Sequence, residues 1–112
     1  MNLAQKNHNP GNLEYRQQRE AIGTDGRFAV YLDDPAGWRG LVDQIKLDQK
    51  RGKTFSQFLH KYAPKEDKNN TGEYLADVCE GLRASFDDSL SLYSPYAVAA
   101  MIAKHEGYFN KE

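Results

Sequence analysis

The stretch from Ser94 to Tyr108, SPYAVAAMIAKHEGY, is the most informative part of this sequence for the fold. Its opening Ser-Pro pair is typical of a helix start, and Gly107 is typical of a left-handed helix end. The residues from Val98 to Ala103 are apolar around almost the whole circumference, which is typical of a helix that runs through a core. We therefore expect a central helix from residue 96 to about residue 106, with the remaining elements packed around it.

Three further helices are expected before this central helix. Asp34 can cap a helix that carries Pro35 in its first turn and ends at Gly52. Thr54–Gln57 fits a capping box for a second helix, which ends before Pro64. The third helix follows a capping signal at residues 70–73 and carries one apolar stripe, made of Tyr74, Leu75, Val78 and Leu82.

One segment, Arg27–Leu32, has the aromatic and branched residues that are typical of a β-strand. Because one strand needs a partner, we expect a hairpin with residues near 13–22, joined by a turn at Gly23–Gly26. A second turn is expected at Asn9–Asn12. The predicted fold class is α+β, mostly α, with about four helices and a short hairpin near the N-terminus.

Length and charge exclude several classes of function. The 112 residues suffice for a single domain spanning residues 1–112. Lys and Arg number 15 and Asp and Glu number 16, so the formal net charge is 15 − 16 = −1. This balance disfavours a nucleic-acid partner held by bulk electrostatics, and it provides no basic face for an anionic membrane. No apolar run approaches the roughly 20 residues that a membrane span needs.

The first residues and the cysteine count indicate a cytoplasmic product without a metal. Residues 1–8 are polar, so we expect a flexible arm and synthesis in the cytoplasm without a signal peptide. The single cysteine, Cys79, excludes an internal disulfide and a multi-cysteine metal site, and the three histidines lack metal-ligand spacing. We expect no metal, no cofactor and a monomer.

Glu106, at the end of the central helix, is the candidate catalytic residue. The dipole at a helix C-terminus and apolar surroundings both favour the neutral form of a carboxyl. A general acid needs such a place in order to stay protonated near neutral pH. The alternative is that Glu106 lies beyond the core in solvent, paired with Lys104 or Lys111.

Several motifs resemble those of a family of small phage and prophage proteins. They are Asn-Pro-Gly-Asn-Leu at residues 9–13, Gly-Arg-Phe-Ala-Val-Tyr at residues 26–31, Tyr-Ala-Pro at residues 62–64 and Asn-Asn-Thr-Gly-Glu-Tyr at residues 69–74. The resemblance covers about residues 9–108. Members of that family are variously labelled virion structural proteins or lytic enzymes.

The order of elements also resembles the lysozyme-like glucosaminidases and lytic transglycosylases of bacterial cell walls, in a circularly permuted form. In those enzymes a helix ends in a catalytic Glu, and an Asn-rich turn, a short β element and a helix with a Tyr-Ala pair follow. Here the Glu-bearing helix comes last, and such a permutation is feasible because the termini of a domain often lie close together. The resemblance implies a lysozyme-like fold, with Glu106 as general acid and the turn at residues 9–13 beside it. Glu106 is followed by Gly107 where those enzymes carry Ser.

The resemblance also implies the binding residues. Tyr74 is expected in the cleft, bonded to Glu106 or to the sugar. The expected sugar contacts are Asn12, Tyr15, Tyr31 and Glu20. Glu20, Asp25 and Asp33 are candidates for the second carboxylate that a hydrolysing glycosidase needs. A lytic transglycosylase needs none, because the muramic acid 6-hydroxyl is its internal nucleophile.

The predicted function is cleavage of the β-1,4 MurNAc-GlcNAc strand of peptidoglycan by one Glu, in the manner of a lytic transglycosylase or a lysozyme. Such an enzyme serves phage lysis or wall penetration and acts at the bacterial cell wall. The alternative is a non-catalytic virion or wall-binding protein of the same fold. Cleavage of wall peptides is disfavoured, since the sequence offers neither a metal site nor an activated nucleophile.

Overall fold

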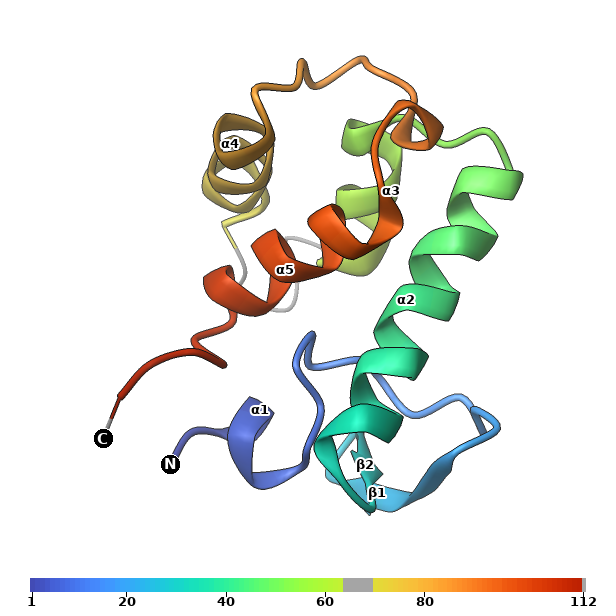
Figure 1. The fold of residues 1–112 in the computed structure, drawn as a ribbon, viewed down its shortest axis with the longest axis vertical. Helices are drawn as coiled ribbons and strands as arrows, with labels where there is room; N and C mark the ends of the chain where they lie inside the picture. Colours follow the sequence, from blue (N-terminus) through green and yellow to red (C-terminus); the bar gives the residue numbers. More distant parts are fainter. Residues whose placement is uncertain (64–69, 112) are drawn as a thin grey trace.

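The computed structural model describes residues 1–63 and 70–111. Within these residues it contains five α-helices, one short 3-10 helix and a two-stranded antiparallel hairpin, so the predicted α+β class with mostly helix is confirmed. The helix α5 (Pro95–His105) lies between α2 (Asp34–Lys50) and α4 (Thr71–Leu82), and α3 (Phe55–Tyr62) packs against α4 (Figure 1). No described helix is long and apolar enough to cross a membrane.

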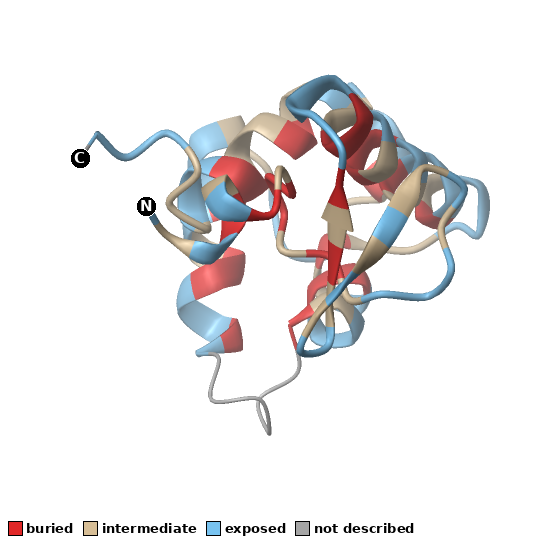
Figure 2. Ribbon diagram, turned by 90° about the horizontal axis from the view of Figure 1, so that it is seen from below, coloured by how far each residue is buried: buried red, intermediate tan, exposed pale blue. Residues whose placement is uncertain are grey.

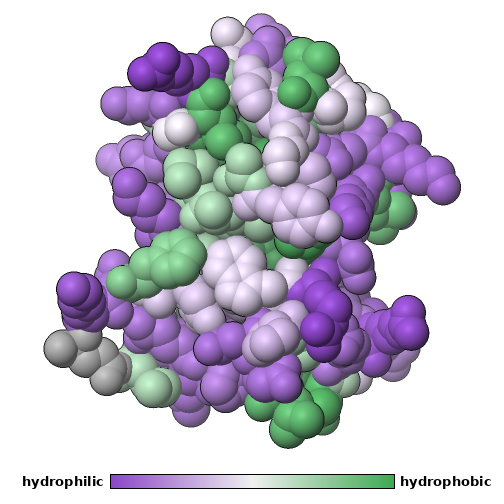
Figure 3. Space-filling view, in the orientation of Figure 1, coloured by the Kyte–Doolittle hydropathy of each residue, from purple (hydrophilic) through white to green (hydrophobic). Residues whose placement is uncertain are grey.

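The central helix is buried as its sequence predicts. Four residues of α5 have no exposed surface: Val98, Ala99, Ile102 and Ala103. Ser94 caps the helix, and Gly107 follows it with a φ of +81°, in the left-handed region that glycine adopts without strain. The buried segments, red in Figure 2, lie on the inward faces of the helices and also on β2. In Figure 3, apolar and weakly polar side chains lie over the middle of the face where α5 runs, and strongly hydrophilic ones surround them.

The other helices begin and end close to the predicted residues. The Asp33 side chain caps α2 by accepting from the Ala36 amide at 3.0 Å, so the capping residue is one position earlier than the expected Asp34. The capping box of Thr54 and Gln57 opens α3 as predicted. Asn70 caps α4. The charged residues between the second and third predicted helices indicate a loop at residues 64–70, which lies, apart from Asn70, outside the described residues. A 3-10 turn, Leu90–Leu92, lies in the connection between α4 and α5.

The hairpin is present, but its pairing is richer than predicted. β1 (Ala21–Asp25) pairs antiparallel with β2 (Phe28–Tyr31), with an irregularity near Gly23. The predicted turn residues 23–25 therefore belong to β1. The earlier segment bonds the other side of β2, where the Ala29 amide donates to Leu13 O at 2.9 Å. The strand β1 thus overlaps the expected range 13–22 only at Ala21 and Ile22, whereas Leu13, at the start of that range, bonds the other edge of β2.

The N-terminus differs most from the prediction. The flexible arm expected at residues 1–8 is instead a capped helix, α1 (Leu3–Lys6), that is bonded to the C-terminal segment. Asn2 Nδ2 donates to Gly107 O at 2.8 Å, and Gln5 Nε2 donates to Tyr108 O at 3.1 Å. Ala4 is fully buried, so an apolar contact adds to these bonds. Polar composition alone did not reveal that these side chains bond backbone carbonyls about a hundred positions away.

Candidate functional site

The carboxyl group of Glu106 lies at the C-cap of α5 and is held by two side chains from distant parts of the chain. Asn12 Nδ2 donates to Oε1 at 2.9 Å, and the Tyr74 hydroxyl donates to Oε2 at 2.6 Å. Neither Lys104 nor Lys111 forms an ion pair with Glu106, which is half-buried. The predicted proximity of the residue 9–13 turn to the end of the last helix is therefore confirmed.

The turn that carries Asn12 is fixed by the fully buried Asn9. Asn9 Nδ2 donates to Leu13 O at 3.0 Å and to Ala29 O at 2.9 Å, and its Oδ1 accepts from the Leu13 amide at 2.9 Å. Asn12 itself has a φ of +49°, a left-handed conformation that asparagine tolerates better than most residues. The Tyr62 hydroxyl also donates to Gly11 O, which fastens the turn to α3. Sequence reasoning recognised the turn but missed Asn9 as its organiser.

Tyr74 is a core residue, and its predicted place in the cleft is wrong. Its side chain has 1% exposure, because the first turn of α4 packs inward against α3 and α5. The ring stacks on the His105 imidazole at 3.8 Å and meets the Tyr62 ring edge-on at 6.3 Å. His105 in turn bonds Asp77 at 2.8 Å. The bond that was expected between Tyr74 and Glu106 is present.

Burial dominates the electrostatics around this group. Desolvation raises the pKa of Tyr74 well above its usual value, and the neighbouring Tyr62 and Glu106 raise it further. Desolvation likewise raises the pKa of Tyr62, and Glu106 adds to the effect. Both phenols therefore keep their protons at neutral pH, and Tyr74 is a hydrogen-bond donor to the Glu106 carboxylate.

The other predicted sugar contacts do not gather at Glu106. Tyr31 has 1% exposure, so its ring cannot stack on a sugar, whereas Tyr15 is on the surface with 37% exposure. Glu20 forms a two-pronged ion pair with Arg39, at 2.6 Å and 2.7 Å. None of these three side chains forms a hydrogen bond or an ion pair with Glu106. The spacing of the tyrosines in the sequence did not reveal which of them are buried in the core.

The remaining candidates for a second carboxylate are engaged elsewhere. Asp33 caps α2, and Asp25 pairs with Lys6 at 3.5 Å. Sequence reasoning missed the one fully buried carboxylate among the described residues, Asp48, which bonds Lys61 at 3.1 Å and Gln44 at 2.8 Å. The sequence signal that could have revealed Asp48 was a charged residue on the inner face of the predicted helix α2.

A groove of about 510 Å³ runs beside the hydrogen bonds of Glu106, between the segment at residues 12–18 and the helices α2 and α3. Asn12 and Tyr62 line it together with Asp48 and Lys61. Asn12 thus joins the groove to Glu106, since its Nδ2 bonds the carboxyl group. Its Oδ1 is buried and has no hydrogen-bond partner among the described residues. An unused acceptor at this place can receive an N–H or O–H donor of a ligand.

Among the described residues, no group of three or more His, Cys, Asp or Glu side chains is arranged to hold a metal ion. In the comparisons with known proteins, no protein-family model matches the chain, and no curated protein matches it.

Proposed function

We propose that this protein cleaves the β-1,4 glycan strand of bacterial peptidoglycan, with Glu106 as general acid and base. The observation that carries the proposal is the carboxyl group at the end of a buried helix, oriented by Asn12 and Tyr74. The order of elements, with the Glu-bearing helix facing an Asn-rich turn and a hairpin, supports a permuted lysozyme-like fold. The proposed setting, phage lysis or entry, is based on the motifs that resemble those of phage and prophage proteins.

The two partners of Glu106 suit a group that gives and takes a proton. When the group is ionised, both Asn12 and Tyr74 donate to it. When Oε2 carries a proton, the Tyr74 hydroxyl can accept that proton in a hydrogen bond, because a hydroxyl is both donor and acceptor. The Asn12 amide still donates to Oε1. The Glu106 carboxyl group therefore keeps both of its hydrogen-bond partners in either protonation state.

The reaction proposed is that of a lytic transglycosylase. Glu106 donates its proton to the glycosidic oxygen, and the bond between this oxygen and the anomeric carbon of the muramic acid breaks. The resulting carboxylate accepts the proton of the muramic acid 6-hydroxyl, whose oxygen attacks the anomeric carbon. No water is consumed, and a 1,6-anhydro ring forms. This route suits a site in which Asp25, Asp33 and Glu20 all have other partners.

The test is zymography on purified peptidoglycan with mass analysis of the products. We expect anhydro-muropeptides from the unmodified protein and a loss of about 10²–10⁴-fold in rate for Glu106→Gln. Glu73→Gln, which makes the same change at an exposed position of α4, is the matched control and should keep full activity. Reducing ends without anhydro products would indicate a hydrolase, and full activity of Glu106→Gln would refute the mechanism.

One observation favours the alternative of a non-catalytic wall-binding protein. Tyr74 is buried, so its bond to Glu106 also ties α4 to the end of α5. If the network were only structural, the unmodified protein would release no products. Glu106→Gln would then lower the free energy of unfolding without any effect on wall integrity. An equal or higher stability of Glu106→Gln, together with lost activity, separates the two functions.

A further inference from the structure

Tyr31 carries a buried hydroxyl group without a partner. Its side chain has 1% exposure, and no described residue forms a hydrogen bond with its hydroxyl oxygen. Burial, with the nearby charges of Glu20 and Asp43, raises its pKa to about 12. An unsatisfied buried hydroxyl costs a folded protein about 1–3 kcal/mol, so its presence calls for an explanation.

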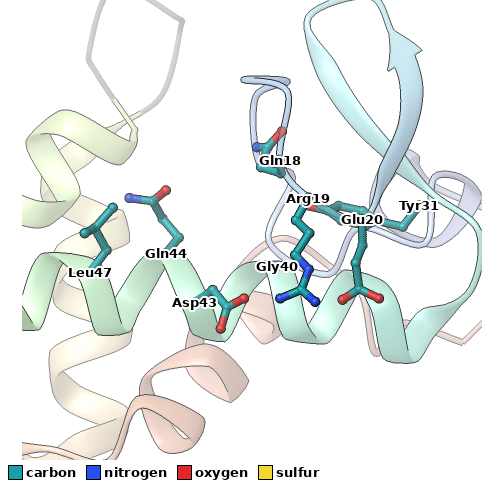
Figure 4. Close-up of a pocket in the computed structure, with 8 residues that line it drawn as sticks. All are labelled: Gln18, Arg19, Glu20, Tyr31, Gly40, Asp43, Gln44 and Leu47. Atoms are coloured by element: carbon teal, nitrogen blue, oxygen red, sulfur yellow. The ribbon is translucent and has the colours of Figure 1, made fainter.

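The hydroxyl lies at a pocket of about 210 Å³ formed by the segment before β1 and one face of α2. Gly40 leaves the space that it occupies, because a Cβ there would meet the hydroxyl oxygen at 2.3 Å. Figure 4 shows Arg19 and Glu20 reaching down toward α2, from which Asp43 and Gln44 project. The volume is below the range of drug-sized ligands, which suits a small terminal group.

The charges at this pocket are not all used by the protein. Arg39 neutralises Glu20 through the two-pronged ion pair. Asp43 and Arg19 are both exposed, and neither forms a hydrogen bond or a close ion pair with a described residue. Arg19 interacts with Glu20, and Asp43 with Arg39, only through longer-range electrostatics. The pocket thus offers one carboxylate, one guanidinium and one buried phenol, together with the amide groups of Gln18 and Gln44.

We propose that this pocket binds a zwitterionic amino-acid or peptide end group. The ligand's ammonium group pairs with Asp43, its carboxylate pairs with Arg19, and the Tyr31 hydroxyl donates to a ligand oxygen. Guanidinium and carboxylate groups bind these partners in charge-assisted hydrogen bonds, which are stronger than neutral ones. A neutral glycan would use neither charge.

The pocket adjoins the groove that reaches Asn12, because Gln18, Gln44 and Leu47 line both. A branched polymer can therefore place its main chain in the groove and a side arm in the Tyr31 pocket. The choice of the peptide arm of peptidoglycan as the ligand rests on the proposed function. The recognition of a zwitterion rests on the pocket alone.

The experiment is a titration followed by nuclear magnetic resonance, with backbone amide shifts as the signal. The probe is the peptide acetyl-L-Ala-γ-D-isoGln-L-Lys, in which the α-carboxyl of the D-Glu residue is amidated. Its only charges are therefore the side-chain ammonium and the terminal carboxylate. We expect shifts at the Gly40 amide and its neighbours. Acetylation of the lysine amine or amidation of the terminal carboxylate should each weaken binding about tenfold, as expected for the loss of a charged hydrogen bond.

Variants separate the pocket from general charge effects. Asp43→Asn should weaken peptide binding about tenfold, and Asp87→Asn, the same change at an exposed position outside the pocket, should leave it unaltered. Tyr31→Phe should weaken binding about two- to tenfold while the melting temperature stays equal or rises, because the unpartnered hydroxyl is removed. If the Tyr31 hydroxyl were merely structural, Tyr31→Phe would lower the melting temperature instead.

The peptide result does not depend on catalysis. If the blocked and free peptides bind equally, or if no shift appears at Gly40, the pocket proposal is wrong even if the protein degrades walls. If the free peptide binds through Asp43 and Arg19 but no glycan is cleaved, the pocket proposal stands and the proposed function fails. A tetrasaccharide of N-acetylglucosamine that shifts Gly40 as strongly as the peptide would also refute zwitterion recognition.

Discussion

At the scale of single residues, the Glu106 network combines a buried donor with a half-buried acceptor. Tyr74→Phe keeps the ring that packs on His105 and Tyr62 but removes the bond to the carboxylate. We expect a fall of about 1.5 kcal/mol in the free energy of unfolding, at the lower end for a bond to a charged group, because water can reach Glu106. Urea unfolding measures this value.

The same variant should also lower the rate of wall degradation. Without the Tyr74 hydroxyl, the Glu106 carboxyl group keeps one side-chain hydrogen bond among the described residues, the one from Asn12, so its orientation is less well defined. Unchanged turnover together with the stability loss would show that Tyr74 is structural alone. Tyr96→Phe, at an exposed position of α5, is the control that should alter neither quantity.

How much of the site the sequence could reveal differed from residue to residue. The sequence revealed both Glu106 and Asn12, because a helix end and an asparagine turn each leave a local pattern. The burial of Tyr31 and Tyr74 could not be read in this way, since tyrosine suits a core and a surface equally well. Their positions depend on tertiary space, such as the gap that Gly40 leaves for the Tyr31 hydroxyl.

At the scale of elements, the close approach of the residue 7–10 segment to α2 depends on Gly37. A Cβ at Gly37 would lie 1.8 Å from His8 O and 2.9 Å from the Pro10 ring. Gly37→Ala should therefore lower the free energy of unfolding by at least about 1–3 kcal/mol, as overpacking does. Gly23→Ala, where no atom lies within 4 Å, should change it by less than about 0.5 kcal/mol. Equal effects in the two variants would contradict this packing.

The helices themselves were predictable because their ends are marked by local chemistry. Each helix end is fixed by a few neighbouring atoms. These belong to the Thr54 and Gln57 capping box, to Ser94 before Pro95, and to the glycines at positions 52 and 107. The helix α1 lacks an apolar stripe, and it is stabilised instead by bonds to the distant C-terminal segment. Elements that depend on distant partners leave no periodic signal in the sequence.

At the scale of the whole molecule, the buried tyrosines set the response to alkaline pH. The pKa of Tyr74 and that of Tyr62 are raised well above 10, mainly by burial. Unfolding frees both phenols to ionise near pH 10, while the native state keeps them protonated. Their contribution to stability is therefore complete below about pH 10 and is lost as the pH rises toward their native values.

We expect the melting temperature to fall steeply above pH 10 and the ultraviolet signal of tyrosinate to appear together with unfolding. Tyr74→Phe should make this fall shallower, because one group with a raised pKa is gone. Tyr96→Phe provides the comparison at an exposed tyrosine. Complete tyrosine ionisation in a protein that is still folded would contradict the burial of these rings.

The conformation of Asn12 restricts which residues evolution or design can place there. The position requires a residue that tolerates a φ of +49° and also donates a hydrogen bond to Glu106. Glycine meets the first requirement only, and aspartate would set a second negative charge against the carboxylate. In a library of all substitutions at position 12 selected for wall lysis, we expect asparagine to be recovered almost alone. The same library selected only for folding should return glycine as well, so the difference between the two selections measures the functional demand on one side chain.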